Sequence, residues 1–488
     1  MNYKVILRIN AGVILAIGLS LLVPLAISFV YRDGSWISFL IPAAAMMTAG
    51  GLGFWMSRSA SSRAVVHVSN RDVLFSVTMA WILAAVLGGV PYLVEGTFVN
   101  PINSTFEAMS GFTTTGATLL PDIEAPSQSI LFWRSMTQWL GGIGIVVLFV
   151  AVAPVLGFGA ARLLSAEVSG IDQPRLTPRI VDTAKALLIV YASLTVAEVI
   201  ALLLAGMNLY DAVLHAFTTI ATGGFNPKNA SVGFYDSIAI EIVIIVFMAL
   251  SAVSFALYYV LYTQRSLKAL LDRELLTYVG ILISSILFVW GILIYEGEYG
   301  DAWGQALRYA AFDVTSVLTT TGYITADFDN WDTGAKFALL LLMFVGGCAG
   351  STAGGIKVVR VIIVFKTILG NLLRAAHPQA VTPLKLGDRV LPEKTHVAVL
   401  GLFAAWILTF VVATFLVAIQ LDLTLTSSVS AVAATLNVIG PGLDQVGATE
   451  NFRAVNNFGR SVLTLCMLLG RLEILTVLAL LSPAFWRR

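Results

Sequence analysis

The stretch Met109-Ser110-Gly111-Phe112-Thr113-Thr114-Thr115-Gly116-Ala117-Thr118 is a small polar segment inside a largely apolar chain. A semi-polar stretch at 102–114 leads into it, and a long apolar run near 128–157 follows it. A bilayer-spanning helix needs about 20 mostly apolar residues, so the stretch 102–114 is too short to cross but long enough for a re-entrant helix. The sequence therefore predicts a short helix that enters a membrane and ends at a Thr/Gly segment.

The Thr/Gly segment has three further copies. Each follows a semi-polar stretch, at 209–221, 304–320 or 426–438, and precedes a long apolar run. The copies read Thr219-Ile220-Ala221-Thr222-Gly223-Gly224-Phe225, Leu318-Thr319-Thr320-Thr321-Gly322-Tyr323-Ile324 and Leu436-Asn437-Val438-Ile439-Gly440-Pro441-Gly442. Alignment on Gly116, Gly223, Gly322 and Gly440 gives spacings of 107, 99 and 118 residues. One Thr-Gly pair is an ordinary loop feature, but four in the same context predict an internal fourfold repeat.

The composition excludes a soluble globule. Of 488 residues, 58% are hydrophobic and only 12% are charged, whereas soluble domains carry about 25% charged residues. The first apolar run is long for a signal peptide and has no cleavage-like site, so we expect a retained membrane span. Ten apolar runs of spanning length fall near 5–30, 36–56, 73–94, 128–157, 183–206, 236–262, 275–295, 334–366, 396–420 and 457–483.

Charge is distributed unevenly over the connections. The segments 57–72, 158–185, 263–274 and 357–394 are rich in Arg and Lys, and by the positive-inside rule they are cytoplasmic, together with both termini. The segment 296–333 is acidic, and an anionic outer mouth would concentrate cations, although solvated acidic loops explain it equally well. The net charge of +1 gives no sign of nucleic-acid binding. The two cysteines, Cys348 and Cys466, lie in apolar runs, which argues against a disulfide framework or a thiolate metal site.

Four Thr/Gly segments in one chain can surround a single axis. Irregular backbone inside a membrane must be buried by protein or line a water-filled cavity. Backbone carbonyls that face such a cavity can replace the water shell of a cation, and helix C-termini that point at it favour positive charge. We therefore expect an all-α polytopic membrane protein with four covalently linked span–re-entrant helix–filter–span units around one pore. The predicted boundaries are 1–60 for an N-terminal two-helix hairpin and 61–160, 161–265, 266–390 and 391–488 for the four pore units.

Over essentially its whole length, the chain resembles the Trk/Ktr/HKT superfamily of potassium transporters, and within it the bacterial TrkH/TrkG branch. The resemblance rests on the extra N-terminal hairpin, the stretch 109–118 and a Gly-rich run in the third unit. It implies a pore in which backbone carbonyls of the four segments coordinate K⁺, with glycine at the key position of every unit favouring potassium over sodium. The fourth unit departs from the Thr pattern, which leaves its register open. The ion-binding residues implied are Thr114, Thr115, Gly116, Ala221, Thr222, Gly223, Thr320, Thr321, Gly322, Val438, Ile439 and Gly440.

The eighth apolar run contains five glycines within ten residues: Gly346, Gly347, Cys348, Ala349, Gly350, Ser351, Thr352, Ala353, Gly354 and Gly355. Because each glycine costs a helix about 1 kcal/mol relative to alanine, a break in the helix is the better interpretation, with close helix packing as the alternative. The resemblance implies that this loop obstructs the pore as a gate.

Arg471 lies in the last apolar run, where a charge is costly and is by default a functional hypothesis. Alignment of the second spans places it opposite Gly142 and Gly347, just below the filter, where it would raise the barrier to cations. The resemblance implies the same role, and the alternative is an arginine satisfied by helix carbonyls. Lys357 and Arg360 are interpreted as anchors at the membrane edge.

The resemblance also implies a location and partners. The protein would be a multi-pass homodimer in the bacterial inner membrane, and a separate cytosolic ring of TrkA-like nucleotide-binding subunits would regulate it. The basic cytoplasmic segments could dock such a ring or bind membrane lipid headgroups. No prosthetic group is expected, because K⁺ is cargo.

The residues alone leave other functions open. Passive conduction and coupling of potassium to protons or sodium are not distinguished by the sequence. A transporter of organic solutes would more commonly show two halves than a fourfold period. An intramembrane enzyme would need a nucleophile–base pair or metal ligands, and none of the four histidines has ligand spacing within a span.

Overall fold

The computed structural model describes residues 2–57, 69–152, 180–265, 270–379, 385–386, 389–420 and 423–486. The basic residues expected at 158–179, most of the segment 57–72, and Arg487 and Arg488 lie outside these ranges, so their predicted cytoplasmic placement is not described. Within them the chain is helical, apart from a two-stranded antiparallel hairpin in which β1 (Lys385–Leu386) pairs with β2 (Arg389–Val390).

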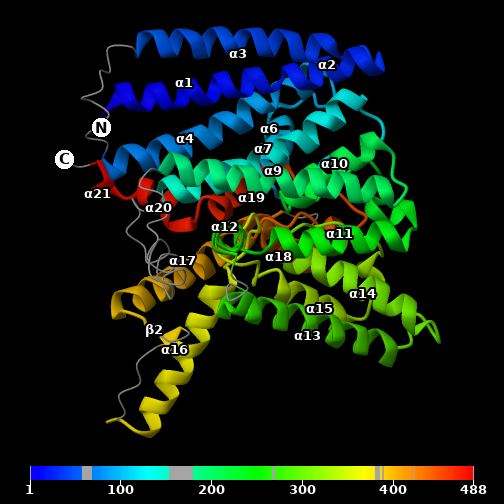
Figure 1. Cartoon of the computed structure of the whole chain (residues 1–488), viewed down its shortest axis with the longest axis vertical. Coiled ribbons are helices and arrows are strands. Elements are labelled where there is room, and N and C mark those ends of the chain that lie inside the picture. Colours follow the sequence, from blue (N-terminus) through cyan, green and yellow to red (C-terminus); the bar gives the residue numbers. More distant parts are fainter. Residues whose placement is uncertain are drawn as a thin grey trace.

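The N-terminal hairpin is formed by α1 (Tyr3–Ser20), α2 (Leu22–Tyr31) and α3 (Trp36–Met56). It lies along one edge of the molecule (Figure 1). Small residues bring its helices together, since a methyl group at Gly53 would lie 2.7 Å from the Ala11 Cβ atom. The hairpin packs onto α4 through α1, which makes it an addition to the outside of the four repeated units.

Each of the four units contains a long first helix, a short helix and a second long element. The first helices are α4 (Asn70–Gly88) with α5 (Val90–Glu95), α9 (Ile180–Leu204), α13 (Arg273–Tyr295) and α17 (Glu393–Ala418). The short helices are α6 (Pro101–Phe112), α10 (Leu209–Ile220), α14 (Trp303–Leu318) and α18 (Leu425–Leu436). The second elements are α7 (Gln128–Val152), α11 (Ile238–Ser251) with α12 (Phe255–Gln264), α15 (Thr333–Leu342) with α16 (Val358–Ala376), and α19 (Asn457–Arg471) with α20 (Ile474–Leu481), followed by α21 (Pro483–Trp486).

Polar side chains set where three of the short helices begin. Asn100, Asn208 and Thr424 each accept a hydrogen bond from a backbone N–H in the first turn of α6, α10 and α18. These bonds satisfy N–H groups that have no partner within the helix. The short helices therefore start at the positions that the semi-polar stretches predicted.

Six helices within the described ranges are long and apolar enough to cross a membrane, and two bent pairs raise the number to eight. The bends are 87° between α11 and α12 and 117° between α19 and α20. Two of the predicted runs, 236–262 and 457–483, are therefore broken spans rather than straight helices. The run 334–366 is broken too, because α15 ends at Leu342 and α16 starts only at Val358.

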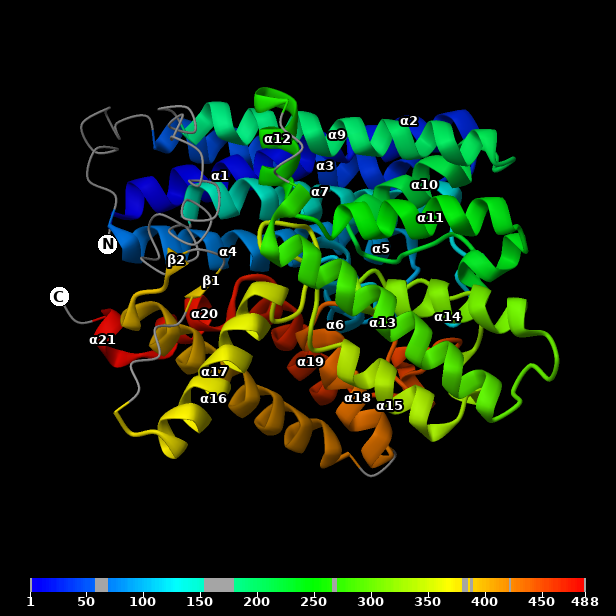
Figure 2. The ribbon, with the colours of Figure 1, turned by 60° about the horizontal axis from the view of Figure 1, so that its bottom comes forward.

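Hydrophobic contacts close the four units into a ring. One buried cluster joins α6 and α7 of the first unit to α18 and α19 of the fourth. Others join the first unit to the second, the second to the third, and the third to the fourth. Every unit therefore shares a core with both neighbours. In Figure 2 the short helix α6 of the first unit lies between α4 and α19.

Candidate functional site

The four Thr/Gly segments share one backbone conformation. In each, the second residue after the short helix is left-handed: Thr114 (φ 58°), Thr222 (52°), Thr320 (58°) and Val438 (63°). The next residue donates its N–H to a carbonyl five positions earlier, at 2.7 to 2.8 Å, in the pairs Thr115–Ser110, Gly223–Thr218, Thr321–Ser316 and Ile439–Ala434. A glycine with positive φ follows: Gly116 (86°), Gly224 (75°), Gly322 (80°) and Gly440 (108°). We call these four stretches the filter segments.

The backbone corrects the predicted alignment in the second unit. Gly223 was paired with Gly116, but Gly223 takes the place of Thr115, and Gly224 is the glycine with positive φ. Ala221 accordingly matches Thr113, the residue that caps the first short helix. The prediction was wrong by one residue because the second unit has two consecutive glycines and the alignment used the first. In the third and fourth units the predicted register agrees with the backbone.

The filter segments contact one another in a closed cycle. A methyl group at Gly116 would lie 2.2 Å from the carbonyl oxygen of Gly223 in the next unit. The same relation links Gly224 to the Thr321 oxygen (2.1 Å), Gly322 to the Ile439 oxygen (1.9 Å) and Gly440 to the Thr115 oxygen (2.8 Å). All four segments therefore surround a single axis, in the order in which they occur in the chain.

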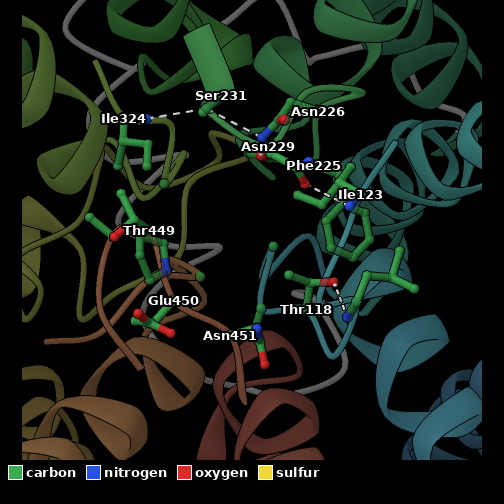
Figure 3. A pocket seen from close by; sticks show the side chains of 18 of the residues that line it. Thr118, Ile123, Phe225, Asn226, Asn229, Ser231, Ile324, Thr449, Glu450 and Asn451 are labelled. Carbon is green, nitrogen blue, oxygen red and sulfur yellow. Dashed lines mark hydrogen bonds between the residues drawn. The ribbon is translucent and has the colours of Figure 1, made fainter. Parts of the chain in front are cut away.

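A cavity of about 130 Å³ opens on one side of this ring. Its lining includes the four positive-φ glycines, and Figure 3 shows that residues of all four units face it, among them Thr118, Asn226, Ile324 and Asn451. Glu450 places a carboxylate at the rim. Since the four short helices end at the filter segments, their C-terminal dipoles favour a cation there.

The chemistry available in the ring is that of oxygen ligands. Within the described ranges, no group of three or more His, Cys, Asp and Glu side chains is placed to hold a metal ion. Carbonyl and threonine hydroxyl oxygens suit a weakly held cation that exchanges its water shell, as in a selectivity filter.

A buried ion pair supports the first filter segment from behind. Arg134 on α7 and Glu107 on α6 are both almost completely buried, with Nε and Oε1 2.9 Å apart. Glu107 also accepts from the Leu119 N–H (2.9 Å) and the Thr118 hydroxyl (2.8 Å), just beyond the filter. The Arg134 guanidinium lies over the Phe225 ring, 3.9 Å from its centroid, and so ties the first unit to the second.

The Gly-rich segment 346–355 is an irregular loop directly against the ring, and we call it the gate loop. Gly354 N–H donates to the Thr320 hydroxyl at 2.6 Å, and Gly355 N–H donates to the Asn437 carbonyl at 3.1 Å. Cys348 N–H donates to the Ala252 carbonyl at 2.8 Å. The loop is thus bonded to the second, third and fourth units, and the expected helix break is present.

Thr352 links the gate loop to α10, α11 and α19. Its hydroxyl lies 3.0 Å from the Ile220 carbonyl oxygen, at the end of α10, and 3.1 Å from that of Ser251, at the end of α11. Its own carbonyl accepts from Arg471 Nη1 at 2.7 Å. The side chain and the backbone of one residue therefore hold the loop from two sides.

Arg471 is buried and contacts the gate loop at Thr352. The alignment predicted a place opposite Gly142 and Gly347, and the residues contacted are Gly141 and Thr352 of the same two segments. The second contact of Arg471 is from Nη2 to the Gly141 carbonyl, at 3.4 Å. Glu473 does not pair with it but forms an ion pair with Arg360. Lys357 Nζ donates to the Ala353 carbonyl within the loop. The role of Lys357 and Arg360 as membrane-edge anchors stays a prediction.

Sequence reasoning missed two buried polar residues that hold this region. Gln138 on α7 contacts the second filter segment through both ends of its amide. Glu274 at the start of α13 accepts from the N–H groups of Ala349 (2.7 Å), within the gate loop, and Val359 (3.2 Å), just after it. A polar residue inside or beside an apolar run was the available signal, but its partner lies far away in the sequence.

The comparisons agree with this architecture. A family described as TrkH, cation transport protein, matches residues 40–295 and 301–488. The chain is 38% identical to the Trk system potassium uptake protein TrkH of Halomonas elongata and 36% identical to that of Escherichia coli, with both chains of each pair fully covered. The crystal structure of the potassium transporter TrkH from Vibrio parahaemolyticus superimposes with a TM-score of 0.91 at 36% identity, again over both complete chains.

The closed ring predicts that Gly224 tolerates no side chain. In Gly224→Ala the new methyl group would lie 2.1 Å from the Thr321 carbonyl oxygen, on a backbone with positive φ. A side chain on such a backbone destabilises the native conformation by about 1–3 kcal/mol, so the segment must move. We expect at least a tenfold loss of cation flux into proteoliposomes. Gly280→Ala is the control, because no atom lies within 4 Å of a methyl group there. Equal flux in both variants would contradict the ring.

The ion pair behind the first segment predicts a loss of stability in Arg134→Met. This change leaves the buried Glu107 carboxylate without its cation, which typically costs about 3–5 kcal/mol. We expect a clearly lower thermal unfolding midpoint in detergent, with partial recovery when Glu107→Gln is added. An unchanged midpoint in the single variant would show that the pair does not stabilise the fold.

Proposed function

The chain belongs to the TrkH family of cation transport proteins, and we propose that it takes up potassium across the bacterial inner membrane through the ring of four filter segments. The observation that carries this proposal is the closed cycle of glycine–carbonyl contacts among Thr/Gly segments from four units. The relatives with full-length matches are named potassium uptake proteins. A multi-pass helical bundle with a central ring of carbonyls is the arrangement that such uptake requires.

With the corrected register, the ligands proposed are backbone and hydroxyl oxygens at the equivalent positions of the four segments. K⁺ passes as cargo, and the carbonyls take the place of its hydration shell. We assign these ligands to Thr114, Thr115, Gly116, Thr222, Gly223, Gly224, Thr320, Thr321, Gly322, Val438, Ile439 and Gly440.

The size of the outer cavity argues against an organic solute. Small-molecule sites usually enclose about 300–1,000 Å³, whereas the cavity that reaches the filter glycines measures about 130 Å³. A wider pocket of about 690 Å³ shares Pro121, Glu450 and Asn451 with it but does not reach those glycines. A dehydrated monovalent cation fits the narrower cavity better.

The proposed gate consists of residues 346–355 and Arg471. Arg471 donates to the Thr352 carbonyl of the gate loop and to the Gly141 carbonyl on α7, and these contacts support a guanidinium next to the proposed pore. A fixed positive charge raises the electrostatic energy of a passing cation. Movement of the loop would also move the Thr352 carbonyl, which holds the Arg471 guanidinium in place.

Regulation is proposed to come from outside the membrane. The basic segments 57–72, 158–185, 263–274 and 357–394 carry most of the cytoplasmic positive charge. In a homodimer, these basic segments would contact a cytosolic TrkA-like nucleotide-binding ring. Anionic lipid headgroups would compete for the same positive charge.

Purified protein in proteoliposomes tests the filter and Arg471 together. We expect K⁺ and Rb⁺ flux well above Na⁺ and Li⁺ flux. At an effective dielectric constant of about 20, a unit charge about 8 Å from the ion costs roughly 2 kcal/mol, so Arg471→Ala should raise K⁺ flux about 10- to 30-fold. Arg460→Ala, near the outer end of the same helix, should not raise it. Equal flux of all four cations in wild-type protein would remove the potassium assignment.

Thr352 allows a separate test of the gate loop. Thr352→Val keeps the shape but loses the one hydroxyl proton, which is shared between the Ile220 and Ser251 carbonyls. Such a hydrogen bond is worth about 0.5–1.5 kcal/mol in total, so we expect K⁺ flux to rise about two- to tenfold. Thr352→Ser keeps the hydroxyl and should stay near the wild-type rate. If the valine and serine variants conduct equally, the hydroxyl does not hold the gate closed.

A further inference from the structure

The filter segments differ in how their side chains support them. In the first segment, the hydroxyls of Thr113 and Thr115 lie 2.8 Å apart, and Thr319 and Thr321 repeat this contact in the third. A hydroxyl pair of this kind ties the residue after the short helix to the residue before the glycine with positive φ. The second segment has Ala221 and Gly223 at these two positions, so it has no hydroxyl to pair.

Gln138 fills the gap in the second segment. Its side chain is fully buried, its Nε2 donates to the Gly223 carbonyl at 2.6 Å, and its Oε1 accepts from the Phe225 N–H at 3.0 Å. The two bonds span Gly224, the glycine with positive φ. A methyl group at Gly223 would lie 2.4 Å from the Gln138 amide carbon, so the absence of a side chain at Gly223 is what admits the amide.

Packing alone does not require glutamine at this place. Gln138 lies three residues before Gly141, whose Cβ position faces the Phe112 carbonyl at 1.8 Å, at the end of the first short helix. In the fourth unit Gly470 faces the Leu436 carbonyl at 2.1 Å in the same way, and the residue three positions before it is the buried Met467. An apolar side chain therefore serves at the equivalent position elsewhere in the ring.

We propose that Gln138 is a specificity-determining positioning residue, which holds the Gly223 carbonyl in the filter and so maintains discrimination between K⁺ and Na⁺. The proposal rests on the proposed potassium uptake. Two consecutive glycines have the greatest backbone freedom of any pair, and selectivity depends on the number and orientation of the carbonyls that an ion meets. The amide restrains the segment at both sides of its most flexible residue.

The decisive variant is Gln138→Met, which keeps the side-chain length and removes both hydrogen bonds. We measure K⁺ and Na⁺ flux into proteoliposomes for the wild type and the variant, and expect the K⁺/Na⁺ flux ratio to fall at least fivefold. Gln138→Asn, which is too short to make both contacts, should move the ratio in the same direction and serves if the methionine variant does not fold.

Gln420→Met is the matched control. Gln420 is also buried, and its amide also holds backbone, accepting from the Asn456 N–H at 2.7 Å and donating to the Val417 carbonyl at 3.1 Å, but it does so in the fourth unit, away from the filter segments. Its loss should lower stability and leave the ion ratio unchanged. An unchanged ratio in the folded Gln138 variants would overturn the proposal, whereas a wild-type protein without K⁺ preference would instead refute the proposed function.

A rescue variant tests the reasoning directly. Gln138→Ala opens space beside Gly223, whose φ is not positive, and Ala221→Thr with Gly223→Thr then recreates the hydroxyl pair of the first and third segments. The triple variant should recover most of the selectivity that Gln138→Ala loses. Failure to recover it in a folded protein would show that the hydroxyl pair and the Gln138 amide do not play the same part.

Discussion

The rest of the structure depends on the contact between one glycine and the carbonyl of the next filter segment. At three of the four places a methyl group would lie between 1.9 and 2.2 Å from that oxygen. No Cβ atom fits at such a distance, so the two backbones pack directly against each other. Only residues without a side chain permit this approach, and positive φ excludes most other residues at the same positions. The helices position this ring: the short helices fix where each segment begins, and the long elements hold the units side by side.

The ring and the gate loop form a single hydrogen-bonded network rather than two separate devices. Gly354 contacts the hydroxyl of Thr320, which itself belongs to a filter segment. Thr352 joins the ends of α10 and α11 and receives Arg471. Under the proposed function, opening of the loop would break bonds to the filter segments, so the free energy of opening would include the support that those segments lose.

The sequence was sufficient for features that repeat or that break a rule. Four Thr/Gly copies predicted the repeated units and five glycines predicted the irregular loop. The alignment of the second spans predicted that Arg471 lies near this loop, which it contacts at Thr352. The register at Gly223 and Gly224 was not recoverable, because two glycines satisfy the pattern equally and only the dihedral angles separate them. Gln138 was missed for another reason: its partners are 85 and 87 residues away, and no local pattern encodes that contact.

A single chain of four units can also do what four identical subunits cannot. Behind the segments, the first unit uses the Glu107–Arg134 pair, the second uses Gln138, and the fourth uses the Ser430 hydroxyl, which accepts from the Leu443 N–H at 2.9 Å. The backbone geometry in front of these supports is nearly the same in each case. Each unit is thus free to change its support alone, provided that the carbonyl it presents stays in place. Similar backbone shape with different supporting side chains is the expected result if, as proposed, the ion is held mainly by the geometry of the ring.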